Sequence, residues 1–493
     1  MFYRALIILG FLSGIQLYSP YCRAATGSQG EDPRKVWIDS FAGLVTAEET
    51  NAEGSAYILT KSLGSGKEGQ VFLAQRSSQN GAQKAREVAL KFINLANFSP
   101  LVRQNIEAGL AVLPTIARHP FLIFHQQQLQ SKNKQVIGLV MDFASQGDLF
   151  DFLVVLSKNK NYLTEREICR FLCQILFGLH YLHDHLQLIH RDLKVENILL
   201  GPAYGQVKIG DFGFVTSLPA SAEMIVGTPR YLPPEVVPRY GMKQSKSQTK
   251  EGDMYALGII AYFLTCMRPP VELDRDNRLV LVNPERLARG EWKKELYRQE
   301  SAPPLSREFR AFVAQCLETS PTVRPSAFSA LNTPLLVFFA ADLLQQSTTL
   351  AAAGVPEQEN VEIQATIKNF FRERIAMQTP LNKMEEGYFS ILLTCFKDYH
   401  YQDGKLSLTA DEHHDGQAIL TFEVEEFTLS LSPEDIIMAM QVPAAYAPER
   451  REHCLTLILA PLAQDEALFC CQSQEQADHL LKLLLRVLRT NQK

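Results

Sequence analysis

The sequence lacks the features that would place it in a specialised class of protein. Nine cysteines in 493 residues are too sparse for a disulfide framework, and Cys169 and Cys173, four positions apart in an apolar run, fit buried helix-face thiols better than a metal pair. The 49 Lys+Arg against 54 Asp+Glu give no general basic field, so nucleic-acid binding has no electrostatic support. With 46% hydrophobic residues, the composition is that of an ordinary globular protein of about three domains.

The N-terminus has the pattern of a secretory signal peptide. One cation, Arg4, precedes an apolar run over Ala5–Tyr18, and small residues lead to a cleavage point after Ala24. The run is shorter than the roughly 20 residues that span a bilayer, so residues 1–24 predict an exported protein. A membrane anchor, or a misplaced start of a cytoplasmic protein, are the alternatives. Small polar residues at 26–33 predict a linker over residues 25–56, with order beginning near Tyr57.

The first motif that carries chemistry is a glycine-rich run of the form G-x-G-x-x-G-x-V between two strand-like segments. Glycines let a hairpin backbone approach a triphosphate closely. A dinucleotide-binding unit would open a helix at once, whereas a second strand follows here. The nucleotide-binding candidates in this run are Leu63, Gly64, Ser65, Gly66, Lys67, Glu68, Gly69, Gln70 and Val71.

A lysine in the next strand needs an anion. Lys91 stands in the apolar strand-like segment at residues 87–93, where an unpaired charge would be costly, and nucleotide phosphates would compensate it. Glu107, the only acid of the helix-like segment at residues 101–117, is the candidate ion-pair partner of Lys91. An unpaired surface glutamate is the alternative.

The decisive stretch is His-Arg-Asp-Leu-Lys-Val-Glu-Asn at residues 190–197, followed by Asp-Phe-Gly at 211–213. With these motifs the sequence resembles the eukaryotic-type Ser/Thr protein kinase family over residues 57–338. The resemblance implies an α+β, two-lobed fold with a small β-rich N-lobe and a large helical C-lobe. It also implies transfer of the ATP γ-phosphate to Ser/Thr hydroxyls of protein substrates. The alternative function is a pseudokinase scaffold that binds partner proteins.

The resemblance assigns roles to residues of these motifs. Asp192 would be the general base for the substrate hydroxyl, and Lys194, typical of the Ser/Thr branch, would steady the phosphoryl group. Asn197 and Asp211 would supply oxygen ligands to Mg²⁺. For the adenosine of ATP, the resemblance implies that Met141 is the gatekeeper residue. Asp142 to Ala144 would form backbone hydrogen bonds to the base, and Asp148 would contact the ribose.

The activation segment resembles the family with departures. Thr228 would link Asp192 and Lys194, while Asp253 and a Glu235–Arg324 bridge would support the loop around them. Arg191 requires an anion. Where many relatives carry a phosphorylated threonine, this chain has Met224 beside Glu223, so we expect Glu223 to replace the phosphate, with Ser221 autophosphorylation as the rival hypothesis. Residues 239–250 predict a solvated loop, with a docking site for acidic substrates as the alternative.

The C-terminal part has a different pattern. Residues 339–382 predict a helical linker, in which an amphipathic stretch at 361–375 packs against a neighbouring domain rather than a membrane or partner helix. Residues 383–493 alternate apolar and polar positions in short strands and end in a helix over 473–489, a pattern that resembles a pleckstrin-homology-like barrel. Its 9 Lys+Arg against 18 Asp+Glu favour a protein partner or autoregulation over lipid binding.

Overall fold

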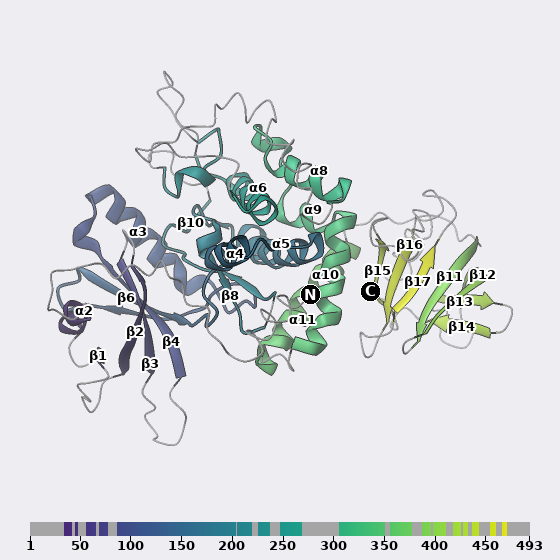
Figure 1. Ribbon diagram of the computed structural model, residues 1–493, viewed down its shortest axis with the longest axis horizontal. Helices are drawn as coiled ribbons and strands as arrows, with labels where there is room; N and C mark the ends of the chain where they lie inside the picture. Colours follow the sequence, from purple (N-terminus) through teal and green to yellow (C-terminus); the bar gives the residue numbers. More distant parts are fainter. Residues whose placement is uncertain are drawn as a thin grey trace. The chain divides into compact units, whose positions relative to one another are not determined.

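The structure is a computed structural model (Figure 1), and the parts of the chain that it describes exclude both predicted terminal segments. The signal peptide over residues 1–24 and the helix over 473–489 therefore stay predictions. Within the described residues, no helix is long and apolar enough to cross a membrane. The described residues are 34–41, 45–47, 56–65, 69–76, 86–203, 205–218, 225–236, 247–268, 305–350, 355–376, 387–395, 398–410, 418–424, 427–431, 436–442, 454–459 and 466–470.

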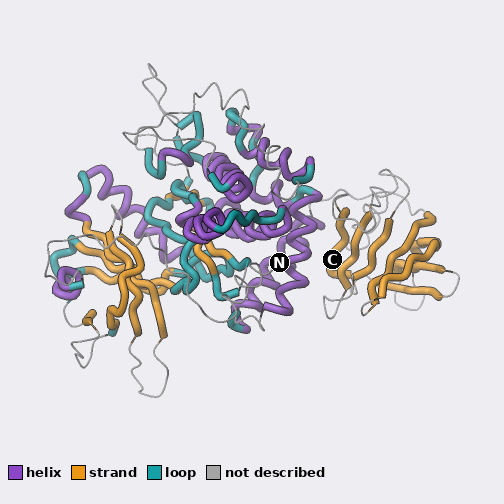
Figure 2. The backbone as a smooth tube through the Cα atoms, in the orientation of Figure 1, coloured by secondary structure: helices purple, strands orange, loops and turns teal. Residues whose placement is uncertain are grey.

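The described chain divides into two compact units. The first comprises residues 1–164, 178–303 and 313–326, and the second comprises residues 165–177, 304–312 and 327–493. Figure 2 distinguishes the helices, in purple, from the strands, in orange.

The first unit begins with a six-stranded sheet of order β1-β2-β3-β4-β6-β5. β1 runs parallel to β2, and all other neighbours are antiparallel. Side chains of β4 alternate between two faces, so Leu90 and Phe92 enter a core on one face while Ala89 packs in a smaller cluster on the other. The strands are β1 (Val45–Ala47), β2 (Tyr57–Ser65), β3 (Gly69–Arg76), β4 (Arg86–Asn94), β5 (His125–Gln130) and β6 (Val136–Asp142).

The segment predicted as a linker is folded where the structure describes it. Helix α2 (Lys35–Ser40) and strand β1 precede β2, and both belong to the first unit. Phe41 and Val45 are only 3% and 1% exposed and join the core of the sheet. The linker prediction was wrong for these residues, because a few aromatic and β-branched side chains without a visible period are enough to complete an apolar face.

The rest of the first unit consists of helices and of short strands that are connected by loops. α3 starts with a proline at its first position, and Asp148 caps α4 by accepting a hydrogen bond from the Asp151 N–H at 2.9 Å. Two small antiparallel sheets, β8–β9 and β7–β10, flank the loops. The elements are α3 (Pro100–Val112), α4 (Leu149–Lys158), β7 (Leu188–Ile189), β8 (Ile198–Leu200), β9 (Val207–Ile209), β10 (Thr216–Ser217) and α6 (Lys250–Cys266). Short 3-10 turns complete it: η2 (Leu95–Asn97), η3 (Leu113–Thr115), η5 (Val195–Asn197), η6 (Pro229–Tyr231) and η8 (Pro321–Val323).

Two further helices cross the division of the chain. α5 (Glu165–His180) starts in the second unit and, continued by the π-helical turn η4 (Tyr181–His185), ends in the first. α8 (Arg307–Cys316) also starts in the second unit, where the Ser306 hydroxyl accepts from the Phe309 N–H at 3.0 Å.

The second unit continues with α9 (Ala327–Leu331), α10 (Pro334–Leu350) and α11 (Glu357–Ala376). Asp342 on α10 accepts from Arg166 and Arg170 at the start of α5, at 2.6 and 2.7 Å. The amphipathic stretch is buried, because its residues Ile363, Ile367, Phe370 and Phe371 are at most 2% exposed, and Phe370 packs on Phe177 and Phe328 of the same unit. Its packing against a neighbouring domain stays a prediction. The predicted boundary at residue 338 instead falls inside α10.

The C-terminal strands form one seven-stranded antiparallel sheet of order β14-β13-β12-β11-β17-β16-β15. Short strands are therefore present in this region, as predicted. The barrel closure, the pleckstrin-homology-like identity and the protein partner of this region stay predictions. The strands are β11 (Gly387–Cys395), β12 (Asp398–Ala410), β13 (Ala418–Val424), β14 (Phe427–Leu431), β15 (Ile436–Val442), β16 (Cys454–Leu459) and β17 (Glu466–Cys470).

Candidate active site

An apolar cluster lies on the inner face of the N-terminal sheet, beside the glycine-rich hairpin. A hydrophobic environment of this kind can receive an aromatic base. The predicted residues Leu63, Val71, Met141 and Ala144 all belong to it. Phe143, inside the predicted stretch Asp142 to Ala144, is also a member, whereas the sequence did not indicate the other three, Ala89, Ile123 and Leu199. Ala89 could have been found, because it stands two positions before Lys91 and therefore on the same face of β4.

The glycine-rich hairpin is formed by β2 and β3, with Ser65 opposite Gln70 in the register. Its tip, Gly66 to Glu68, lies outside the described residues. A Cβ at Gly69 would overlap the backbone carbonyl of Phe92 on β4, so only glycine allows this approach of the two strands. A Cβ built at Gly64 would have no described atom within 4 Å, so packing within the protein does not explain why glycine stands at this position.

The two acids predicted beside the nucleotide lie at the end of β6 and at the start of α4. The Asp142 side chain accepts hydrogen bonds from Gln126 at 2.7 Å and from Arg118 at 3.0 Å, and its backbone N–H donates to the Phe124 carbonyl. Burial raises the pKa of Asp148 to about 7, despite its hydrogen bond from the Asp151 N–H. Asp148 can therefore carry a proton near neutral pH.

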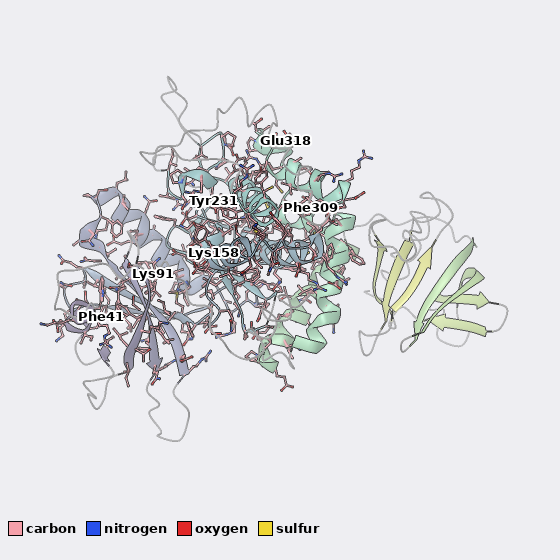
Figure 3. All side chains as sticks on the ribbon, viewed as in Figure 1. Phe41, Lys91, Lys158, Tyr231, Phe309 and Glu318 are labelled. Atoms are coloured by element: carbon pink, nitrogen blue, oxygen red, sulfur yellow. The ribbon has the colours of Figure 1, made fainter. Side chains whose placement is uncertain are left out.

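Lys91 and Asp211 form a close ion pair, with Nζ and Oδ1 2.6 Å apart (Lys91 is labelled in Figure 3). Lys91 is 8% exposed. Burial would raise the pKa of Asp211, but the Lys91 ammonium and its hydrogen bond outweigh this and lower it to about 2. Asp211 has a positive φ of 57°, a backbone strain that the surrounding loop must hold in place.

The predicted pair between Lys91 and Glu107 was wrong for this structure. Glu107 on α3 is exposed and accepts from the Arg103 side chain at 2.9 Å. The buried face of α3 carries Gly109 and Leu110. Gly109 lies so close to the Gly213 carbonyl that an added Cβ would be 3.1 Å from its oxygen, and this contact turns Glu107 outward.

Asp192, Lys194 and Thr228 form a closed triangle of hydrogen bonds. The Thr228 hydroxyl donates to Asp192 Oδ1 at 2.7 Å and accepts from Lys194 Nζ at 3.0 Å. Lys194 also donates to Asp192 Oδ2 at 2.6 Å, and the Thr228 N–H donates to Oδ1 at 2.7 Å. The predicted link through Thr228 is therefore present, and it fixes a carboxylate and an ammonium side by side at the site.

Asn197 and Asp211 offer oxygens that suit a magnesium ion. The Asn197 amide nitrogen donates to the Asp192 carbonyl at 2.8 Å, which fixes the orientation of the side chain. One amide oxygen and one carboxylate held ionised by Lys91 are the hard ligands that Mg²⁺ prefers. The chemistry of these two donors fits the predicted metal.

Two predicted supports of the loop are present. Asp253 on α6 accepts from the His190 N–H at 2.8 Å and from the Arg191 N–H at 3.0 Å. Glu235 and Arg324 form a two-point ion pair with both distances at 2.7 Å. The Arg324 side chain is 0% exposed, so its charge depends on this carboxylate.

Sequence reasoning missed a residue that holds the activation segment. Gln248 was placed in a solvated loop, yet it is only 7% exposed. Its amide nitrogen donates to the Val226 carbonyl at 2.9 Å, and its amide oxygen accepts from the Val226 N–H at 3.3 Å. Val226 lies two residues before Thr228, so this clamp fixes the backbone that leads to the triangle. A single glutamine in a polar stretch gave no signal of this role.

Arg191 lies beside the same segment. Its Nε donates to the Phe214 carbonyl at 2.6 Å, and burial lowers its pKa to about 10. The predicted anions at Glu223 and Ser221 lie outside the described residues. The expectation that Glu223 replaces a phosphate stays a prediction.

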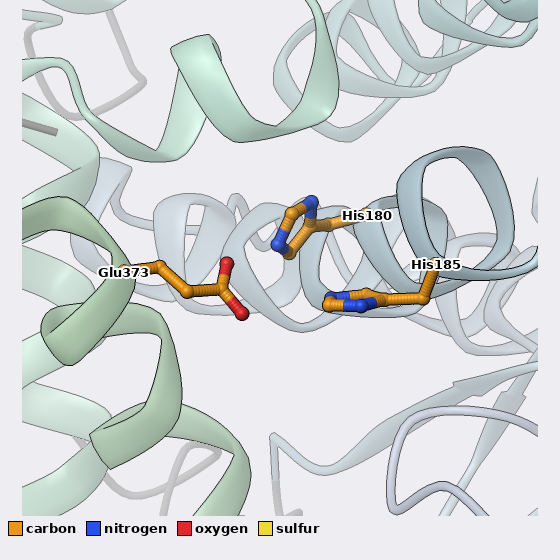
Figure 4. A group of neighbouring side chains, drawn as sticks. All are labelled: His180, His185 and Glu373. Carbon is orange, nitrogen blue, oxygen red and sulfur yellow. The ribbon is translucent and has the colours of Figure 1, made fainter. Parts of the chain in front are cut away.

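Two histidines at the end of α5 and in η4 form a separate group (Figure 4). The rings of His180 and His185 have centroids 4.9 Å apart, and His180 Nδ1 lies 2.8 Å from the Asp184 carboxylate. Burial opposes ionisation of Asp184, but His180 and Lys250 outweigh it and lower the pKa of this acid.

The comparisons with known proteins match the same part of the chain. A family model described as "Protein kinase domain" matches residues 57–336. The human protein named "Serine/threonine-protein kinase Nek5" is 28% identical over 284 residues, which are 57% of this chain and 36% of that protein. The human "Serine/threonine-protein kinase H1" is 33% identical over 245 residues, 48% of this chain and 53% of its own length.

A yeast relative has the same pattern of coverage. "Serine/threonine-protein kinase KIN4" of Saccharomyces cerevisiae is 27% identical over 238 residues, 47% of this chain and 28% of that protein. The chain thus spans between about a quarter and about a half of the length of these relatives.

Proposed function

The chain belongs to the protein kinase domain family, and we infer from its site that it is a protein serine/threonine kinase that uses ATP and Mg²⁺. The observation that carries this inference is the triangle of Asp192, Lys194 and Thr228 next to the Lys91–Asp211 pair. Phosphoryl transfer needs positioned charges more than covalent help from the protein, and these groups provide them.

The apolar cluster supports the choice of nucleotide. Val71 on the hairpin and Leu199 on β8 belong to one cluster with Met141 at the end of β6. A purine base fits between such side chains, while Lys91 reaches the phosphates from the same face of β4 as Ala89. The family's use of ATP is consistent with this geometry.

Each polar group then has a role in the transfer. Asp192 accepts the hydrogen bond of the substrate hydroxyl, whose oxygen forms a bond to the γ-phosphorus as the bond from phosphorus to the departing ADP oxygen breaks. The hydroxyl proton passes to Asp192. Lys194 stabilises the charge on the migrating phosphoryl group. Asn197 and Asp211 would hold Mg²⁺, which neutralises phosphate charge when bound.

The test is a phosphorylation assay of the full chain. Wild type and Asp192→Asn are incubated with labelled ATP, Mg²⁺ and a basic test protein, and the labelled amino acids are identified after hydrolysis. We expect phosphoserine and phosphothreonine, and a loss of rate of about 10²- to 10⁴-fold in the variant, the usual contribution of a general base. Equal labelling by the two proteins would refute the enzymatic function, and phosphotyrosine alone would refute the substrate class.

A further inference from the structure

The segment before the matched region places one aromatic ring against the strand that carries Lys91. Trp37 on α2 stacks on Phe92 of β4, with ring centroids 5.2 Å apart and an interplanar angle of 6°. Phe41 packs on the same ring from the end of the helix, at 5.4 Å. Phe92 is 0% exposed and follows Lys91 directly, so the stack lies on the face of β4 opposite to that lysine.

The same indole is bonded to the glycine-rich hairpin. Its Nε1–H donates to the side-chain oxygen of Gln70 at 2.9 Å. Gln70 is the second residue of β3 and pairs with Ser65, the last residue of β2 before the hairpin tip. On its other side, Gln70 pairs with Phe92 of β4. One side chain therefore contacts both the hairpin that covers the phosphates and the strand that carries the lysine.

Gly69, next to Gln70 on β3, packs directly against the backbone of Phe92 on β4. Gly69 has no room for a Cβ against the Phe92 carbonyl, so the backbone of β3 is close to that of β4 beside Gln70. A movement of the Phe92 ring or of the Gln70 side chain would therefore displace both strands. Trp37 contacts both of these side chains, Phe92 through its ring and Gln70 through its Nε1–H.

We propose that Trp37 is a positioning residue for the nucleotide, acting through Gln70 and Phe92 on the glycine-rich hairpin and on Lys91. Residues 34–47 then belong functionally to the kinase domain, although they precede the matched residues 57–336. The inference rests on the proposed ATP-dependent function. Its consequence is a segment outside the family's own boundaries that sets nucleotide affinity.

The test compares variants of the full chain that remove different parts of the contact. Trp37→Phe keeps a ring on Phe92 and loses the hydrogen bond, whereas Ile38→Ala removes apolar packing from the same helix without touching Gln70. We measure the dissociation constant for MgADP by calorimetry, the KM for ATP, kcat and the unfolding temperature. One lost hydrogen bond predicts an approximately fivefold weaker binding of ADP and a similar rise in KM for ATP in Trp37→Phe, with kcat nearly unchanged.

Ile38→Ala is expected to lower the unfolding temperature and to leave both nucleotide constants at the wild-type values. A double-mutant cycle of Trp37→Phe with Gln70→Leu should be non-additive, because both substitutions break one bond. Unchanged ADP binding in Trp37→Phe, or an equal weakening in Ile38→Ala, would overturn the proposal. A wild type that binds ADP but transfers no phosphate would instead refute the proposed function, and the ADP constants would still decide the role of Trp37.

Discussion

The hydroxyl of Thr228 connects the two charged groups of the candidate active site, so its removal tests the catalytic geometry directly. It lies 2.7 Å from the carboxylate of Asp192 and 3.0 Å from the ammonium of Lys194. Thr228→Val keeps the shape of the side chain and removes both bonds, whereas Thr228→Ser keeps the hydroxyl. The Thr228 backbone N–H still donates to Asp192 at 2.7 Å in either variant, so part of the positioning survives.

The expected fall in kcat follows from the loss of hydrogen bonds to two charged groups, Asp192 and Lys194. A hydrogen bond to a charged group contributes about 1.5–3 kcal/mol, and since the backbone bond remains, we take the loss in Thr228→Val as about 1.4–2.7 kcal/mol. This corresponds to a fall in kcat of about 10- to 100-fold. Thr228→Ser should remain within about threefold of wild type.

The assay is a set of initial rates for the three proteins at varied ATP and varied protein substrate, with unfolding temperatures measured in parallel. Thr228 is not a member of the apolar cluster, so the KM for ATP should stay the same in all three. A kcat for Thr228→Val within twofold of wild type would refute the reasoning. So would an equal fall in Thr228→Ser and Thr228→Val, because the hydroxyl would then not be the active element.

Two further predictions concern buried side chains. Gln248→Leu removes both hydrogen bonds to Val226 and should lower kcat at least fivefold, whereas the exposed control Gln104→Leu should not; equal rates in initial-rate assays would contradict the clamp. Both ring nitrogens of His125 are buried and have no hydrogen-bond partner among the described residues, and burial lowers the pKa of this histidine from 6.5 to about 4. The unfolded chain then binds more protons, so stability should fall as the pH drops from about 6.5 to about 4. Urea titrations at pH 7 and 5 measure the free energy of unfolding, which should decrease less between these pH values in His125→Leu than in wild type. An equal decrease in both proteins would contradict the role of His125.

The catalytic part of the fold was predictable from the sequence because its motifs combine residue type and order. A lysine in an apolar strand and acids in loops between short strands are local signals. In the structure Lys91 pairs with Asp211, and Asp192 accepts a hydrogen bond from Lys194. The folded segment before Tyr57 gave no such signal. Its contribution depends on single aromatic side chains, Trp37 and Phe41, whose partner Phe92 lies about 50 positions away, and no local pattern records such a contact.

Gln248 illustrates a different limit of the sequence. A glutamine amide imitates a peptide group, so it can bind the N–H and the C=O of one residue at once. The composition around it is polar and predicts a solvated loop. Only the fold brings the Gln248 amide to its partner Val226.

The position of Glu107 shows how the phase of a helix decides a site. The acid was chosen because it is the only one in its segment, but successive residues of a helix point about 100° apart. The inward direction of α3 is set at Gly109, where an added Cβ would be 3.1 Å from the Gly213 carbonyl oxygen. With Gly109 inward, Leu110 is buried and Glu107 is turned to Arg103. The helix therefore meets the loop after Asp211 through backbone and apolar contacts, and the charge of Lys91 is compensated by Asp211 itself.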